Sequence, residues 1–201
     1  FGYPFCRGRL LNVLEKDRGQ YDTVRSLFWA TGAALMVRPA DWNAAGGFDA
    51  RFFAHFEEID FCWRLRARAR KIVCVTDSVV YHVGGGTLPA DNPRKTYLNF
   101  RNSLTMLYKN LPDDELQHVL NVRKWLDAMA WFKFFVSGDF ANAKAVRRAR
   151  KDFHKWQHQF DPERKKNLEN TTLFDIPERI QRSLIYAFYV QGKKTFAQFM
   201  S

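Results

Sequence analysis

The sequence has few cysteines, no long apolar run and relatively few acidic residues. The three cysteines, at positions 6, 62 and 74, form no Cys-x-x-Cys pair. This argues against a disulfide framework or a zinc cluster and favours a reducing compartment. No apolar run reaches the roughly eighteen residues of a membrane span, and the first residues lack the order of a signal peptide. Because the chain starts at Phe1 rather than Met, we expect a fragment of a longer protein.

The shortage of acidic residues leaves a net charge of +11, from 32 Lys and Arg against 21 Asp and Glu. Such an excess indicates an anionic partner, which could be nucleic acid, a membrane surface or a phosphorylated ligand. Nucleic acid is the weakest of these, because no RNP, KH, helix-turn-helix or zinc-finger pattern appears. With 46% hydrophobic residues, the chain of 201 residues can fill a core.

The densest polar chemistry lies at residues 46–64, which read GGFDARFFAHFEEIDFCWR. A helix that begins near Glu57 places Glu57, Asp60 and Arg64 along one face, with Glu58 about 100° away. The same spacing is also typical of an ordinary amphipathic helix, with an acidic first turn and an ion pair from Arg64 to Glu57 or Asp60. The pattern alone leaves both interpretations open.

Periodicity and turn residues predict the order of the elements. Apolar and β-branched runs predict a buried strand at 28–37, a second strand at 71–76 and an extended segment at 78–83. Pro39 and Gly46 bound a predicted short helix. Further helices are expected at 57–68, 94–109, 113–136, 140–158 and 177–191, with irregular structure at 1–27, 84–93 and 160–175.

This order predicts an α/β domain followed by a mostly α-helical tail. Two or three strands cannot complete a sheet, so we expect the other half of the α/β domain to lie outside this chain. We divide the chain into an α/β part at 1–110 and a basic, aromatic-rich helical region at 111–201.

Five blocks follow one another along the first part of the chain: TGAALMVR at 31–38, GGFDARFF at 46–53, EEIDFCWRLR at 57–66, VVYHVGGGTL at 79–88 and YLNFRNSL at 97–104. Together they resemble bacterial family 2 glycosyltransferases, in particular rhamnosyltransferase-like members that build cell-surface polysaccharides. The resemblance covers about residues 1–110, and the rest only as a variable helical tail. It implies a GT-A fold, a Rossmann-like mixed sheet, of which this chain is the acceptor-side half.

The donor half of similar enzymes ends in an Asp-x-Asp motif that binds a divalent metal, Mn²⁺ or Mg²⁺. This sequence has no Asp-x-Asp, so the resemblance implies that the chain is inactive by itself. His82 matches the family histidine that can complete the metal's coordination, and imidazole suits Mn²⁺ better than Mg²⁺. A lone histidine at the end of a strand is otherwise an ordinary structural residue.

The resemblance implies inverting transfer, in which a carboxylate takes the proton of the acceptor hydroxyl while positive charge stabilises the departing diphosphate. The family position of the base corresponds to Glu58, with Asp60 and Glu57 as the second and third candidates. A carboxylate at a helix N-terminus should have a lowered pKa. We therefore expect a low pKa for this base.

Other positions that match the family blocks are predicted to contact substrates. The implied acceptor-side residues are Gly32, Gly46, Gly47, Trp29 and Trp63. Arg94 and Arg101 would neutralise the donor diphosphate, next to a mobile loop at Gly84–Gly86. The residue types also allow simpler roles, as turn and cap glycines, core tryptophans and a solvated basic helix start.

The end of the helix predicted at 57–68 departs from the family pattern. Similar proteins have Gly after the RLR of this helix, whereas this chain continues Ala67-Arg68-Ala69-Arg70. Since Gly ends helices in a left-handed conformation, we expect this helix to end less sharply.

The tail interleaves aromatic residues of 125–135 with basic residues of 144–155. This composition suits helices that lie on an anionic membrane, but a packed hairpin with a solvated basic face has the same composition. The leading hypothesis is a cytoplasmic transferase at the inner face of the plasma membrane. It would use a nucleotide-diphosphate sugar and a glycan or lipid-linked acceptor. The alternative is a non-catalytic membrane-docking or glycan-binding module.

Overall fold

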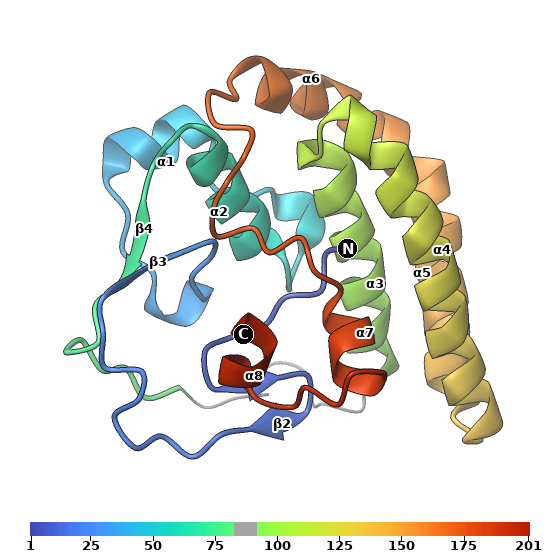
Figure 1. The fold of residues 1–201 in the computed structure, drawn as a ribbon. Coiled ribbons are helices and arrows are strands. Elements are labelled where there is room, and N and C mark those ends of the chain that lie inside the picture. Colours follow the sequence, from blue (N-terminus) through green and yellow to red (C-terminus); the bar gives the residue numbers. More distant parts are fainter. Residues whose placement is uncertain (83–91) are drawn as a thin grey trace.

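The computed structural model describes residues 1–82 and 92–201. The predicted loop at Gly84–Gly86 therefore lies outside the described residues. Helices make up most of the described part, and two small antiparallel sheets flank them (Figure 1). This mixture agrees with the α/β class in general, but the described residues form only two-stranded sheets and no Rossmann-like sheet.

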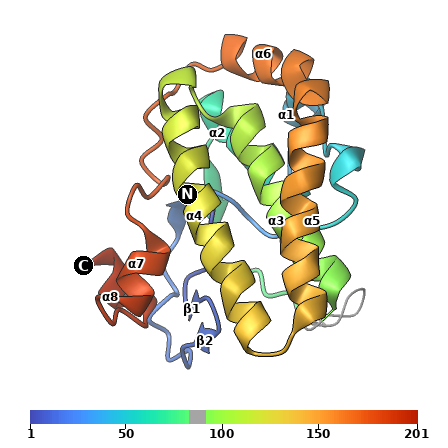
Figure 2. The same cartoon turned by 90° about the vertical axis from the view of Figure 1, so that its right-hand side faces the viewer.

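Three long helices form one side of the molecule (Figures 1 and 2). They are α3 (Pro93–Asn110), α4 (Asp113–Val136) and α5 (Phe140–Trp156). Asn92 caps α3 by accepting from the N–H of Arg94 at 2.8 Å, and Asp139 caps α5 in the same way. Helix α5 packs against both α3 and α4. The helices predicted here are confirmed to within two residues at each end.

The other side carries residues 46–64, which we call the motif stretch. Helix α1 (Pro39–Ala45) ends at Gly46, whose φ is 83°, and α2 (Glu57–Ala67) follows. Strands β3 (Arg25–Leu27) and β4 (Ile72–Cys74) pair antiparallel, with Leu27 opposite Ile72. A short hairpin of β1 (Arg9–Leu10) and β2 (Val13–Leu14) lies near the N-terminus. The predictions of α1, α2 and β4 are confirmed.

The strand predicted at 28–37 is wrong. Pairing occurs earlier, in β3, and Gly32–Ala34 forms a 3-10 turn instead. Thr31 accepts from the N–H of Ala33 at 3.5 Å, an interaction by which Ser and Thr favour turns over strands. The apolar side chains of Leu35 and Val37 pack against the core without any strand pairing. Likewise, residues 78–82 of the predicted extended segment form no strand.

The C-terminal region also differs from the sequence prediction. Residues predicted as irregular contain α6 (Asp161–Glu169), which begins with a proline in its first turn. The helix predicted at 177–191 is reduced to α7 (Leu184–Tyr189), which begins where Ser183 caps it. A further helix, α8 (Phe196–Met200), starts with a capping box. These short helices depend on caps, which have weaker sequence signals than long apolar periods.

The largest core cluster joins the two halves of the sequence. It contains Phe52 and Ile59 of the motif stretch, Met106 of α3, Val119 of α4 and Ile176 near the C-terminus. A smaller cluster packs α7 and α8 onto the N-terminal hairpin, and a third lies between α1 and α2. In the described residues no helix is both long and apolar enough to cross a membrane.

Helix α2 ends sharply, contrary to the sequence expectation. The N–H of Arg70 donates to the carbonyl of Leu65 at 3.0 Å, and that of Ala69 donates to Arg66 at 2.9 Å. These two bonds define a Schellman motif, in which the residue after the cap must be left-handed. Ala69 takes that conformation, with φ 57°. The backbone therefore forms the usual glycine ending without a glycine.

Replacing Ala69 with Gly should stabilise the fold by about 1 kcal/mol, because a left-handed Cβ costs roughly that amount. The measurement is the free energy of unfolding in urea. Ala128→Gly, at an exposed position inside α4, is the matched control and should lose about 1 kcal/mol. A loss at both positions would contradict this description of the helix end.

Candidate functional site

The turn that leads into α2 has a strained backbone. Phe53, His55 and Phe56 have φ angles of 67°, 68° and 73°. Positive φ is uncommon for residues with a side chain, and each instance costs about 1–2 kcal/mol. Such conformations persist only where the surrounding structure holds them, and they concentrate at functional sites. The turn is therefore a candidate site on backbone grounds alone.

Helix α3 holds this turn in place through Asn102. Its buried side-chain amide donates to the carbonyls of Phe52, Ala54 and His55 at 2.9, 2.8 and 2.7 Å. The two N–H groups of this amide are shared among three carbonyls of the irregular backbone, so one of the bonds is bifurcated.

Arg101, predicted to contact the donor diphosphate, has a structural role beside Asn102. Its guanidinium donates to the carbonyls of Arg51 and Phe52 at 3.0 Å each. The side chain is buried, and it lies over the rings of Tyr97 and Trp156. Its hydrogen bonds are directed into the protein rather than toward a ligand.

Glu57 and Glu58 follow the strained turn as the first residues of α2. Both are half-buried, and each has one buried carboxylate oxygen that finds no hydrogen-bond partner among residues 1–82 and 92–201. His55, two residues before them, has a buried Nε2 in the same state. Unsatisfied buried polar atoms are uncommon and call for a functional or solvent explanation. Three of them occur here within four residues.

Glu58 has a raised pKa, so the expectation of a lowered value is wrong. Burial raises the pKa of Glu58 above its ordinary 4.5, and the charge of Glu57 raises it further. Backbone N–H groups of the first turn act in the opposite direction, as expected for a helix N-terminus, but they do not cancel these effects. A carboxyl with a raised pKa is a better general base near neutral pH.

His55 is a site residue that the sequence analysis did not select. Burial lowers the pKa of His55, and the nearby charge of Lys95 lowers it further, against the opposing charge of Glu57. The imidazole is therefore neutral at physiological pH and can accept a hydrogen bond. Its sequence signal was weak, since it consists of one histidine two residues before an acidic pair.

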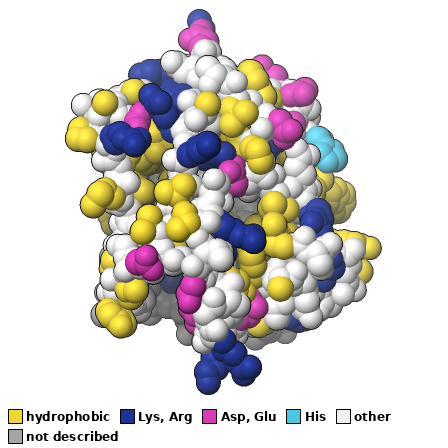
Figure 3. All heavy atoms as spheres, turned by 60° about the vertical axis from the view of Figure 1, so that its left-hand side comes forward, with side chains coloured by type: hydrophobic (Ala, Val, Ile, Leu, Met, Phe, Trp, Pro, Cys, Tyr) yellow, Lys and Arg dark blue, Asp and Glu magenta, His cyan; other side chains and the backbone are white. Residues whose placement is uncertain are grey.

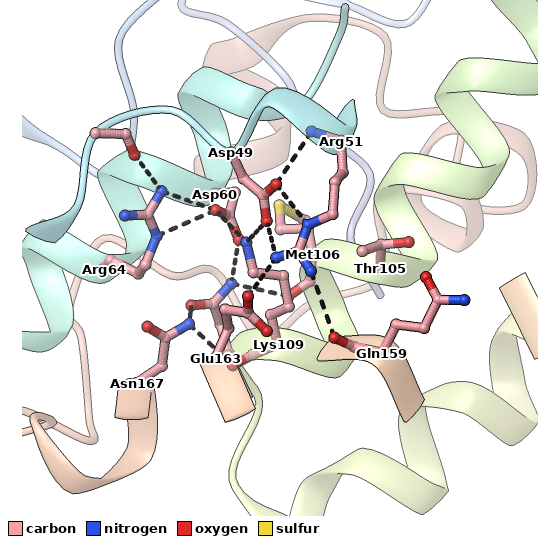
Figure 4. Close-up of polar contacts among 12 residues, drawn as sticks. Asp49, Arg51, Asp60, Arg64, Thr105, Met106, Lys109, Gln159, Glu163 and Asn167 are labelled. Atoms are coloured by element: carbon pink, nitrogen blue, oxygen red, sulfur yellow. Dashed lines mark hydrogen bonds and ion pairs between the residues drawn. The ribbon is translucent and has the colours of Figure 1, made fainter. Parts of the chain in front are cut away.

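Asp60, the second candidate base, lies in a different environment. It is fully buried, and its carboxylate accepts from Arg64 at 2.9 and 3.1 Å, from Lys109 at 2.9 Å and from Asn110 at 2.8 Å (Figure 4). Both oxygens are thus occupied. Of the two partners proposed for Arg64, the structure shows Asp60. We assign Asp60 a structural role.

The network around Asp60 extends to the preceding turn and to α6 (Figure 4). Lys109 also donates to Asp49 at 2.9 Å, and Arg51 joins Asp49 to Glu163 with bonds of 2.7 Å. Although burial alone would raise the pKa of Asp49, hydrogen bonds from Arg51 and Lys109 hold it well below its usual range. The charges of this network therefore connect the motif stretch with α3 and α6.

The three predicted glycines have different surroundings. Gly32 lies beside the candidate base, since a Cβ there would be 3.8 Å from the Cβ of Glu58. Gly46 caps α1 in the left-handed conformation. A Cβ on Gly47 would come within 2.8 Å of the indole of Trp42. Gly46 and Gly47 therefore have structural roles, and Gly32 alone of the three lies next to Glu58.

Both predicted tryptophans belong to the core cluster. Trp63 is 5% exposed and meets Phe28 edge to face, with ring centroids 5.4 Å apart. Trp29 packs against the same cluster but is only half-buried, and it lines an open groove of 1880 Å³ together with Gly32. Trp63 lines the same groove, but Trp29 is the more exposed of the two and offers more of its ring to a ligand.

Arg94 and His82 are exposed. The guanidinium of Arg94 lies 4.5 Å from the ring centre of Phe53, on the strained turn, so this arginine is close to the site. No cluster of three or more His, Cys, Asp or Glu within residues 1–82 and 92–201 could hold a metal ion. One exposed imidazole is not a sufficient ligand set, and the described residues do not fit a divalent metal by themselves.

Comparisons of the chain with protein-family models, with curated proteins and with solved structures found no match. The roles assigned at this site therefore depend on its geometry and on the sequence resemblance.

Replacing Asp60 with Asn should destabilise the fold by about 3–5 kcal/mol, because Arg64 would be left as a buried charge without a counterion and Lys109 would keep only Asp49. Urea unfolding measures the loss. Glu163→Gln breaks a half-exposed pair with Arg51 and should cost less than about 1 kcal/mol. A loss in Asp60→Asn that is no larger than the loss in Glu163→Gln would contradict the structural role of Asp60.

Replacing Glu58 with Gln should raise the melting temperature by a few degrees at neutral pH. A raised folded pKa means that the stability due to protonated Glu58 is complete below 4.5 and is lost as pH rises through the folded pKa. The advantage of Gln should therefore disappear as pH approaches 4.5. Thermal melts across pH test this, with the exposed Glu169→Gln as control. An equal effect of both substitutions would contradict the raised pKa.

Proposed function

We propose that this chain forms the acceptor side of an inverting glycosyltransferase, in which Glu58 takes the proton of the acceptor hydroxyl. The observation that carries this proposal is the environment of the Glu58 side chain. Its carboxyl is half-buried at a strained helix start, has a raised pKa and has one oxygen without a hydrogen-bond partner in the described part of the chain. Gly32 leaves space next to it, where an acceptor could approach.

The reaction is a single displacement at the anomeric carbon. The acceptor oxygen forms a bond to that carbon as the bond to the diphosphate breaks, and the hydroxyl proton passes to Glu58. General base catalysis of this kind contributes typically about 10²–10⁴-fold. The charge of Glu57 assists by raising the pKa of Glu58, which makes it a stronger base.

Positive charge near the site would stabilise the departing diphosphate. Arg94 is exposed above Phe53, and Lys95 is close enough to His55 to lower its pKa. We keep Arg94 as the diphosphate contact and leave out Arg101, whose hydrogen bonds go to backbone carbonyls.

The donor sugar nucleotide would be bound by a second half of the domain. The sheet of β3 and β4 supports this, because a two-stranded ribbon is marginal by itself. In and near these strands apolar side chains are exposed at Val24, Val73, Val75 and Val80. Hydrophobic side chains gather in several places on the face shown in Figure 3. Exposed apolar groups of this kind indicate a surface that another segment covers.

The divalent metal of the proposed reaction would then be held by Asp-x-Asp residues of that second half. Mn²⁺ or Mg²⁺ would supply charge to the diphosphate, and His82 is the one ligand that this chain would add. We propose a cytoplasmic location, with a glycan or lipid-linked acceptor in cell-surface polysaccharide synthesis. A non-catalytic glycan-binding module on the same scaffold would need no base, and the following experiment separates the two.

In the protein that includes the donor half, Glu58→Gln should lower kcat by at least about 100-fold and leave the KM for the donor unchanged. Steady-state transfer kinetics measure both values, and Glu169→Gln is the exposed control. Full turnover in Glu58→Gln would remove Glu58 as the base.

Glu57→Gln gives a second readout. It removes the charge that raises the pKa of Glu58, so the acid limb of the kcat/KM profile should move to lower pH while turnover persists. A profile that does not move would mean that Glu57 does not act on the base.

A further inference from the structure

The second half of α4 has an exposed apolar stripe. Its members are Trp125, Met129, Phe132 and Val136, which are 72%, 63%, 59% and 63% exposed. They follow one another at i, i+4, i+7 and i+11, so they form one line along the helix. Large apolar groups that are contiguous and exposed mark an interaction surface more often than single ones do.

The opposite face of α4 prevents the helix from turning this stripe inward. Arg123 and Asp127 are buried there and pair at 3.1 Å. Asp127 also pairs with Arg150 of α5, and Arg123 donates to Ser103 of α3 at 2.9 Å. Rotation of α4 would break these buried ion pairs, so the stripe stays exposed. Helix α4 itself lies at the surface of the helical layer in Figure 2.

Basic residues border the stripe on both sides. Lys124 precedes Trp125 and Lys133 follows Phe132, and a step of about 100° per residue places the two lysines on opposite flanks. Both are exposed. The neighbouring α5 adds further exposed basic side chains at Lys144, Arg147, Arg148 and Lys151.

The acidic groups near this surface have other partners. Asp139, at the turn between α4 and α5, accepts from the backbone and side chain of Asn142. Asp152 accepts from Tyr97 and pairs with Arg148. The aromatic surface extends across the turn, because Phe140 is 61% exposed and meets Phe135 with ring centroids 5.5 Å apart.

We propose that this surface, the α4 stripe with its flanking lysines, docks on an anionic phospholipid membrane. The helix would lie in the plane of the interface with its aromatic side chains among the acyl chains and its lysines at the phosphates. Charge complementarity selects this occupant. A second copy of the chain would bring two basic surfaces together. The inference is independent of sugar transfer.

Flotation of the 201-residue chain with phosphatidylcholine vesicles, with and without phosphatidylglycerol, tests the proposal. Binding should require the anionic lipid and should weaken as salt is added. Phe132→Ser should lower the partition coefficient about tenfold, as expected for withdrawing one large apolar side chain from the interface. Phe174→Ser, with the same exposed fraction of 59%, is the matched control and should leave binding unchanged.

A charge-matched pair of variants tests the lysines. Lys124→Gln with Lys133→Gln should weaken binding to anionic vesicles about fivefold per residue. Lys16→Gln with Lys71→Gln removes the same charge from other exposed positions and should have little effect. Equal losses in the two double variants would overturn the proposal, because binding would then depend on net charge alone.

Three further outcomes would overturn it. The first is that the chain does not float with anionic vesicles, and the second is that Phe132→Ser and Phe174→Ser bind equally. The third is that sedimentation without lipid shows a dimer that Phe132→Ser dissociates, which would assign the surface to a second copy. No donor or acceptor sugar is present in these assays, so none of these outcomes bears on the role of Glu58.

Discussion

The structure depends on one buried carboxylate. Asp60 accepts hydrogen bonds from Arg64 of its own helix and from Lys109 of α3, and all three side chains are almost fully buried. Arg64 in turn donates to the carbonyls of Ala45 and Gly47, which holds the turn after α1 against α2. Arg64 would be very unfavourable in this interior without this anion, and Lys109 would be left with Asp49 alone. Asp60 therefore sets how the motif stretch and the helical layer meet.

The contact between α2 and α3 around Asp60 lies next to a strained turn. Asn102 of α3 donates hydrogen bonds to three backbone carbonyls of this turn. In the same turn His55 and Phe56 have positive φ angles. The unfavourable backbone, together with the half-buried Glu58, reduces stability at the point where we place the chemistry. Functional sites commonly retain such features, because a group that reacts with a ligand cannot also be fully satisfied within the protein.

Sequence patterns correctly predicted those helices whose apolar periodicity and first-turn charges lie within one segment of the chain. Helix α2 began at Glu57 as expected, and α4 matched its predicted bounds, because long periods and first-turn charges act within one segment. The prediction failed where contacts with other segments of the chain determine the backbone conformation. The apolar run at 28–37 resembles a strand, yet without a neighbouring strand it became a 3-10 turn at Gly32–Ala34 and loops that pack on the core. Ala69 took the left-handed conformation in which a glycine usually ends a helix, since the two Schellman bonds hold it there.

For the candidate site, the sequence by itself determined which carboxylates are present and that Glu57, Glu58 and Asp60 start one helix. It did not determine their environments. Only the tertiary structure decided that Asp60 is an ion-pair centre, because Lys109 and Asn110 come from a helix about fifty residues away. It also left one Glu58 oxygen without a hydrogen-bond partner among the residues that the structure describes. The raised pKa of Glu58 has the same origin. A helix N-terminus favours the charged form locally, but burial, which depends on the whole fold, outweighs it.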